Sequence, residues 1–243
     1  MAIILERFKS FAFEFQNFLF RFLLKVNLSI RNTEEVIFLG NAYSGYWFPK
    51  SLTGSRGIIW GVGLGHDSSF ELELINLGYD FIGFEPESKC FASSKKQFAG
   101  TKAIIENYGL WDKAGKFHYT GTNISIVDIF DIGKKSEELL DIRSLWDECD
   151  LRNTTYQSKP RILKLNIEGA EREILLKFIE EPLDFDVIIF QAEFLFHLGF
   201  KRVGKKVLAY KELLRILRTL KIESWKIAHF SRHQITLLRD VSH

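Results

Sequence analysis

Three alternating glycines, and an acid at a fixed distance from them, are the residues of this chain best suited to binding a small molecule. Gly61, Gly63 and Gly65 follow a short apolar run, and Glu85 closes a second one. Glycine lets the backbone approach a ligand closely, and a carboxylate can accept both hydroxyls of a ribose. The acid follows the last glycine by 85 − 65 = 20 residues, which is the spacing of a ribose contact. We therefore expect a nucleoside ligand.

The glycine spacing separates two classes of nucleoside cofactor. The nicotinamide fingerprint G-x-G-x-x-G fails here, because its last position holds His66 when counted from Gly61 and Ser68 when counted from Gly63. The pattern G-x-G-x-G does fit, and it is the usual form in enzymes that use S-adenosyl-L-methionine. A tight turn without any ligand is the structural alternative, although a turn alone does not require three alternating glycines and an acid.

A strand, a turn, a helix and a second strand must position these residues. Residues 58–62 predict a buried strand, and residues 81–84 predict its neighbour. Ser68 and Glu71 have the spacing of a capping box that opens a helix, and Gly78 is suited to end it. The free N–H groups of that helix would face the ligand.

A second group of polar residues follows two later apolar runs. Asn166 and Glu168 lie at the tip of the run 161–167, whereas Glu193 and His197 lie near the end of the next run or just past it. In a doubly wound sheet, ligands bind beyond the carboxyl ends of the strands. We therefore expect these four side chains beside the glycine turn, within a mostly parallel α/β sheet.

Several motifs, in order, resemble those of the FkbM-type methyltransferase family. Residues 63–70, G-L-G-H-D-S-S-F, resemble the family's G-x-G-x-D-x-S-F, and residues 84–86 match its F-[DE]-P. Residues 163–171, L-K-L-N-I-E-G-A-E, resemble L-K-[IL]-D-[IV]-E-G-A-E. The segments 43–47 and 109–117 resemble a Y-G-G-W element and a G-L-W…F element. One departure is Asn166, which stands where the family has Asp.

The resemblance implies a class I methyltransferase, with a Rossmann-like sheet and S-adenosyl-L-methionine as cofactor. It implies O-methyl transfer to a hydroxyl of a sugar, a glycan or a related small molecule, and no metal site. The positions that it and the strand pattern assign to cofactor binding are Gly61, Gly63, Gly65, His66, Asp67, Ser69, Glu85, Pro86, Asn107, Tyr108, Gly109 and Asn166.

A methyl acceptor hydroxyl needs a base, since an alcohol is a poor nucleophile until its proton is taken. Glu193 ranks first as that catalytic base and His197 second, because both follow an apolar strand. Glu168 is the third candidate and fits a cofactor or turn contact better. Ordinary structural roles are the alternative for all three.

Residues 1–34 form an extension ahead of the expected methyltransferase domain, residues 35–243. The run 3–26 is rich in Phe and carries one narrow polar stripe on a helical pattern. Polar residues in its middle argue against a bilayer-spanning helix. Three alternatives stay open: packing on its own domain, a homo-oligomer interface, or peripheral contact with a membrane surface.

Composition sets the remaining expectations. The formal net charge of +2 is too small to argue for a nucleic acid partner, so we expect none. Cys90 and Cys149 lie far apart and form no metal or disulfide pattern, which favours the cytoplasm. A non-catalytic protein that uses the N-terminal helix for binding or assembly is the alternative function, and Asn166 is the residue that supports it.

Overall fold

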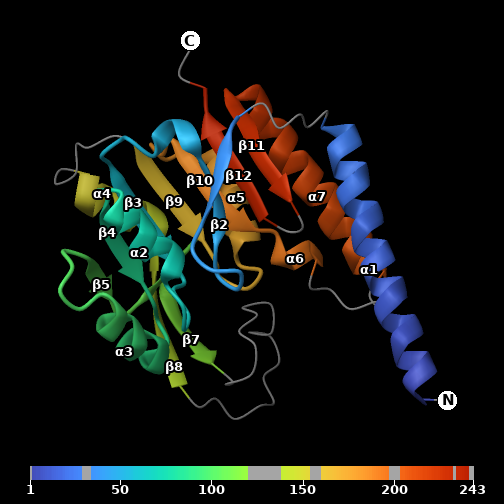
Figure 1. Cartoon of the computed structure of the whole chain (residues 1–243), viewed down its shortest axis with the longest axis horizontal. Coiled ribbons are helices and arrows are strands. Elements are labelled where there is room, and N and C mark those ends of the chain that lie inside the picture. The colour runs from blue at the N-terminus through green and yellow to red at the C-terminus, as the bar shows by residue number, and fades with distance from the viewer. Residues whose placement is uncertain are drawn as a thin grey trace.

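The computed structural model describes residues 2–28, 34–119, 138–153, 160–196, 203–231 and 234–240. Its centre is a seven-stranded sheet with the order β11-β12-β10-β9-β3-β4-β5 (Figure 1). The strands are β3 (Ile58–Val62), β4 (Asp80–Phe84), β5 (Ile104–Glu106), β9 (Arg161–Leu165), β10 (Val187–Gln191), β11 (Trp225–Ser231) and β12 (Gln234–Arg239).

The strand order identifies the fold class. Strands β3, β4, β5, β9 and β10 pair in parallel, whereas β12 is antiparallel to both of its neighbours. The chain reverses direction across the sheet between β3 and β9, which is the switch point where doubly wound sheets bind ligands. The inserted antiparallel strand is the arrangement of class I methyltransferases. The predicted mostly parallel, Rossmann-like sheet is thus confirmed.

Helices cover both faces of this sheet. Strand residues such as Ile59 and Phe81 pack with α2 (Ser69–Asn76) and α3 (Ser88–Gln97). Alternate residues such as Trp60 and Leu163 pack with α5 (Glu171–Glu180) and α7 (Val203–Ile222). Because successive strand side chains point to opposite faces, the continuous apolar runs of the sequence supply both layers.

Two small sheets lie beside the large one. Strands β1 (Val36–Leu39) and β2 (Tyr46–Pro49) form an antiparallel pair, and η1 (Lys50–Leu52) follows them. Strands β6 (Gly109–Trp111), β8 (Glu138–Ser144) and β7 (Gly115–Tyr119) form the other sheet, and α4 (Leu145–Asn153) continues from β8.

The N-terminal helix α1 (Ala2–Asn27) packs along α7 with one of its faces (Figure 1). Phe20 and Tyr210 place their ring centroids 5.3 Å apart, and Leu24 is fully buried. Of the three alternatives for this run, packing on its own domain accounts for this face of the helix.

The predicted starts of two helices need correction, because the side chains expected at them make other contacts. The capping box is wrong: Ser68 caps α2 without a side-chain hydrogen bond, and Glu71 forms an ion pair with Lys164. Helix α3 begins after Glu87, not at Pro86, because the Glu87 carboxylate accepts the N–H groups of Lys89 and Cys90.

Candidate active site

The glycine turn follows β3, and each of its last two glycines serves a different purpose. Gly63 has a φ of 76°, and a Cβ there would lie 2.0 Å from the carbonyl oxygen of Asn166, so the β9 tip packs directly against it. Gly65 has a φ of 60°, and its Cβ would meet no atom within 4 Å. The turn is therefore closed toward β9 and open at Gly65, where a ligand can approach the backbone.

The predicted ribose contact, Glu85, is buried directly after β4 and turns toward the glycine turn. Its Oε2 accepts the N–H groups of Leu64 and Gly65, each at 2.9 Å, and its Oε1 accepts the N–H of Glu87 at 2.9 Å. Burial raises the pKa of this carboxyl, although those N–H groups act in the opposite direction. A carboxylate has about four acceptor sites. Both sites of Oε2 are occupied, so one site on Oε1 remains for a ligand hydroxyl, one fewer than the two ribose hydroxyls expected.

Asp67 and Ser69 bind another part of the protein, the turn 40–45. The Asp67 carboxylate accepts the amide N–H of the Asn41 side chain, and the Ser69 Oγ accepts the Asn41 backbone N–H at 3.0 Å. Burial acts to raise the pKa of Asp67, but hydrogen bonds from Asn41, Ser44 and Ser69 outweigh it and lower that pKa to about 2. These two motif residues therefore hold the turn 40–45 in place. Sequence reasoning missed Asn41 as their partner.

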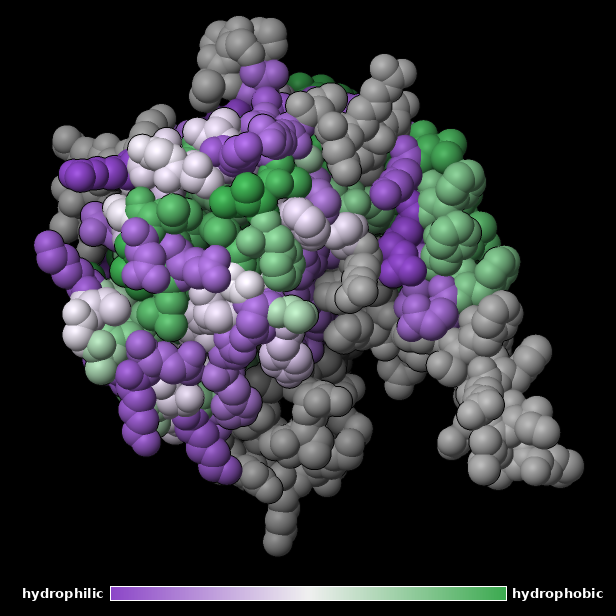
Figure 2. All heavy atoms as spheres, in the orientation of Figure 1, coloured by the Kyte–Doolittle hydropathy of each residue, from purple (hydrophilic) through white to green (hydrophobic). Residues whose placement is uncertain are grey.

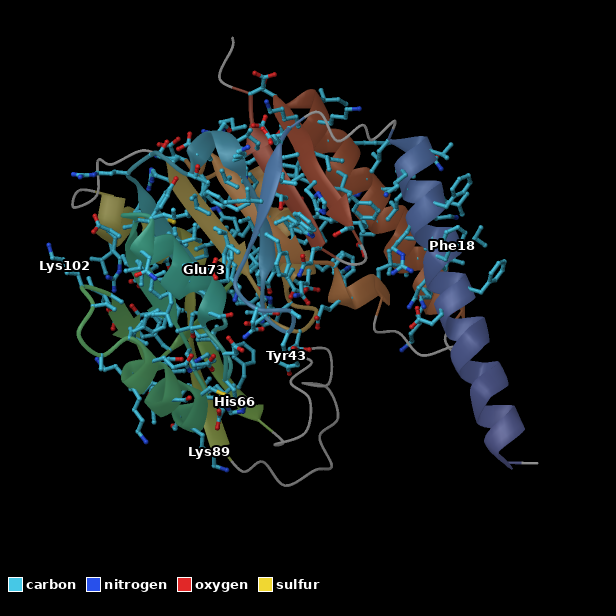
Figure 3. The ribbon with its side chains drawn as sticks, viewed as in Figure 1. Phe18, Tyr43, His66, Glu73, Lys89 and Lys102 are labelled. Carbon is cyan, nitrogen blue, oxygen red and sulfur yellow. The ribbon has the colours of Figure 1, made fainter. Side chains whose placement is uncertain are left out.

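The turn 40–45 presents Tyr43 to solvent at the same edge of the sheet (Figure 3). Asn41 holds the turn by accepting the backbone N–H groups of Tyr43 and Ser44 on its Oδ1 at 2.8 and 3.0 Å. Tyr43 is 89% exposed, whereas Tyr46 and Phe48 are buried. The later residues of this aromatic segment, Tyr46 and Phe48, therefore pack into the core, whereas Tyr43 is placed where it can reach a ligand.

A buried ion pair supports the glycine turn from beneath. The Lys164 ammonium donates to the Gly63 carbonyl at 2.9 Å and lies 3.0 Å from the Glu71 carboxylate. It also lies 5.3 Å from the centre of the Tyr46 ring. A buried charge needs such partners. The sequence motif contains Lys164, but its spacing alone did not predict this role.

The residues after β5 divide between the pocket edge and the core. Asn107 is exposed and donates to the Glu85 carbonyl at 3.0 Å. Tyr108, which the sequence assigns to cofactor binding, is buried instead, and its hydroxyl donates to Glu148 at 2.8 Å. Gly109 leaves room for Pro86, whose Cγ would lie 3.1 Å from a Cβ at Gly109.

His66 is exposed at the turn and lies beside the thiol of Cys90, with 3.6 Å between the Cys90 Sγ and each ring nitrogen. Its carbonyl accepts a hydrogen bond from Gln97 at 3.0 Å, and Gln97 also accepts the N–H of Ser68 at 3.1 Å. His66 therefore shapes the turn and fastens it to α3.

Two predicted catalytic carboxyls are brought together beyond β9 and β10. Glu193 opens α6 (Glu193–Phe196) and forms a side-chain hydrogen bond with Glu168. Burial is the main cause that raises the pKa of Glu193, and nearby Glu171 raises it further. Two carboxyl groups can share a hydrogen bond only when one carries the proton. The two carboxyls therefore form a coupled pair, in which Glu193 is buried and Glu168 is half-buried.

Backbone strain marks the same place. Glu168 has a backbone φ of 54°, in a region that residues other than glycine rarely adopt. Gly169 follows with a φ of 105°. Glu171 fixes this turn by accepting the N–H groups of Ile167 and Gly169 at 2.9 and 2.8 Å. Strained residues persist only where the surroundings hold them, and they concentrate at functional sites.

Three further points concern the expected site. His197 lies outside the described residues. Asn166 is half-buried at the tip of β9, where its backbone N–H donates to the Val62 carbonyl at 2.9 Å. Within the described residues, no cluster of three or more His, Cys, Asp or Glu side chains could hold a metal ion.

Comparisons with known proteins concern the fold. No family model and no curated protein matches the sequence. A putative rRNA-methylase from Clostridium thermocellum is similar at 10% identity and a TM-score of 0.39, over 79% of this chain and 93% of that chain. A ribosomal protein L11 methylase from Lactobacillus delbrueckii subsp. bulgaricus is similar at 10% identity and a TM-score of 0.38, over 76% of this chain and 70% of that chain. A putative RNA methyltransferase from Pyrococcus horikoshii is similar at 12% identity and a TM-score of 0.36, over 91% of this chain and 98% of that chain.

These structures are described as methylases or a methyltransferase, and enzymes with the class I fold take their methyl group from S-adenosyl-L-methionine. The similar structures include proteins described as rRNA and RNA methylases, and the expectation that excluded nucleic acid as a partner is withdrawn. The net charge of +2 is an average over the whole chain, and it carries no information about local basic surfaces.

Proposed function

We propose that this protein is an S-adenosyl-L-methionine-dependent O-methyltransferase of the FkbM type. The observation that supports it most is the meeting, at one sheet edge, of the glycine turn, Glu85 and the Glu168–Glu193 pair. The glycine turn and Glu85 suit a nucleoside, and the carboxyl pair offers the base that an alcohol acceptor needs.

The residues of the turn fit the cofactor. Gly65 is open to close approach, and Glu85 keeps an acceptor site for a ribose hydroxyl next to it. Asn107 lies at the same end of the parallel strands, where its amide can reach an adenine edge. When bound, the cofactor supplies an electrophilic methyl group on a sulfonium.

The carboxyl pair supplies the proton chemistry. With one of the two carboxyls ionised and the other protonated, the ionised one would accept the proton of the acceptor hydroxyl. Its protonated partner would donate a hydrogen bond that keeps the base oriented. The cofactor would supply the methyl group to the acceptor oxygen. Burial of Glu193 holds its pKa above the ordinary value, which brings it closer to neutral pH.

Turnover of the Glu193→Gln variant tests the assignment of the base. The variant should lose on the order of 100-fold in turnover and keep its cofactor affinity, because a general base contributes about that much. Radiolabelled S-adenosyl-L-methionine would be assayed against sugars, glycans and RNA as acceptors. Glu180→Gln, an exposed change on α5, is the matched control. Turnover within a few-fold of wild type would reject Glu193 as the base.

A further inference from the structure

Helix α1 carries a continuous apolar stripe on the side that faces away from α7. Its members are strongly exposed: Phe18 59%, Leu19 42%, Phe22 53% and Val26 59%. Their spacing of three and four residues puts them on one side of the helix. Figure 2 shows this stripe as a green band at the edge of the molecule, and Figure 3 shows Phe18 on the outer side of α1.

This stripe is not what attaches α1 to the body. The attachment uses the opposite face, where Phe20, Leu24 and Leu28 are buried. The Lys206 ammonium from α7 reaches the same interface and donates to the Asn17 side chain. Since α1 is already anchored without the stripe, the stripe remains available for another contact, and exposed apolar patches normally mark one.

We propose that the stripe docks on the surface of an anionic lipid bilayer, with α1 lying in the plane of the interface. Phe and Leu side chains on one face of a surface helix, next to basic residues, are typical of this binding mode. No helix in the described part of the chain is long and apolar enough to span a bilayer. The proposal does not depend on the methyl-transfer chemistry.

Charge selects this occupant over a second copy of the chain. The neighbouring helix α7 exposes a set of basic side chains: Lys205, Lys211, Arg215, Arg218 and Lys221. The acid within that stretch, Glu212, forms an ion pair with Arg172, and Glu14 is an exposed acid on α1. A basic surface attracts anionic headgroups. A second copy packed on the stripe would leave this basic surface without negative charge opposite it.

Vesicle flotation of the full-length protein tests the proposal. The probes are vesicles of phosphatidylcholine alone and vesicles that also contain phosphatidylglycerol. Wild type should float with the anionic vesicles, and added salt should weaken binding. The double variant Phe18→Glu/Phe22→Glu should bind on the order of tenfold less or weaker still, because it places charge in the apolar stripe. Leu151→Glu, at a 67% exposed position on α4, is the matched control.

Circular dichroism and thermal unfolding would establish that both variants fold. Equal flotation of wild type and the double variant would overturn the proposal, as would no flotation of wild type at low salt. Light scattering adds one further outcome. A wild-type dimer that the double variant lacks, without lipid binding by either protein, would identify a second copy as the occupant and reject the membrane.

Discussion

At the scale of single residues, the site depends on carboxyl groups held in places that disfavour their charge. Glu85, Glu171 and Glu193 are each buried near the glycine turn or the β9 tip, and burial raises the pKa of each. Backbone N–H groups satisfy the first two. Glu193 relies on Glu168, whose backbone is strained. Such environments suit proton transfer near neutral pH.

Glu171 predicts a pH dependence of stability. Burial raises its pKa to about 8 from the ordinary value of 4.5. The folded protein therefore keeps a proton that the unfolded chain releases, and the free energy of unfolding should fall as pH rises between those two values. Glu171→Gln cannot titrate, so denaturant melts from pH 5 to 8 should show a smaller decline. The exposed Glu180→Gln should keep the wild-type slope, and an unchanged slope in Glu171→Gln would contradict the shift.

At the scale of elements, the turn 40–45 and the glycine turn form one unit. Asn41 binds Asp67 and the backbone of its own turn, which couples the segment before β2 to the segment after β3. Tyr43 is held out into solvent by this coupling. A pinned turn with an exposed ring is suited to contact a ligand, since loops on rigid scaffolds supply many binding residues.

Asn41→Ala should release that turn. Tyr43 and Ser44 would lose the acceptor of their backbone N–H groups, at a cost of roughly 1–2 kcal/mol in local stability. Hydrogen exchange at those two amides should then accelerate about 5- to 30-fold. Ser51→Ala, which removes a hydrogen bond to Glu34 in a nearby loop, is the control and should leave them unchanged. Unaltered exchange in Asn41→Ala would show that other contacts hold the turn.

The elements that sequence predicted best are those with a strong period and clear ends. Residues 58–62 and 81–84 agree with β3 and β4 within a residue, because apolar runs flanked by polar residues define buried strands. The capping box failed because Lys164, distant in sequence, binds Glu71 more strongly than the helix end does. Likewise, the Asn41–Asp67 contact joins residues 26 apart, and no local pattern encodes it.

At the scale of the whole molecule, the chain combines a class I methyltransferase sheet with a helix that has two apolar faces. The sheet's switch point between β3 and β9 brings the glycine turn and the β9 tip together. Helix α1 lies on α7, along the side of the sheet where β11 runs (Figure 1). The candidate active site and the proposed membrane contact therefore use different parts of the molecule.

Calorimetric titration with S-adenosyl-L-methionine, S-adenosylhomocysteine and NAD tests the central claim, that the glycine turn and Glu85 bind this cofactor. Wild type should bind the first two and not NAD, whose fingerprint the turn lacks. Glu85→Ala should weaken binding by roughly 2–3 kcal/mol, about 30- to 150-fold, the scale of hydrogen bonds to a charged group. No binding of either sulfur compound, or equal affinity in folded Glu85→Ala, would contradict the account.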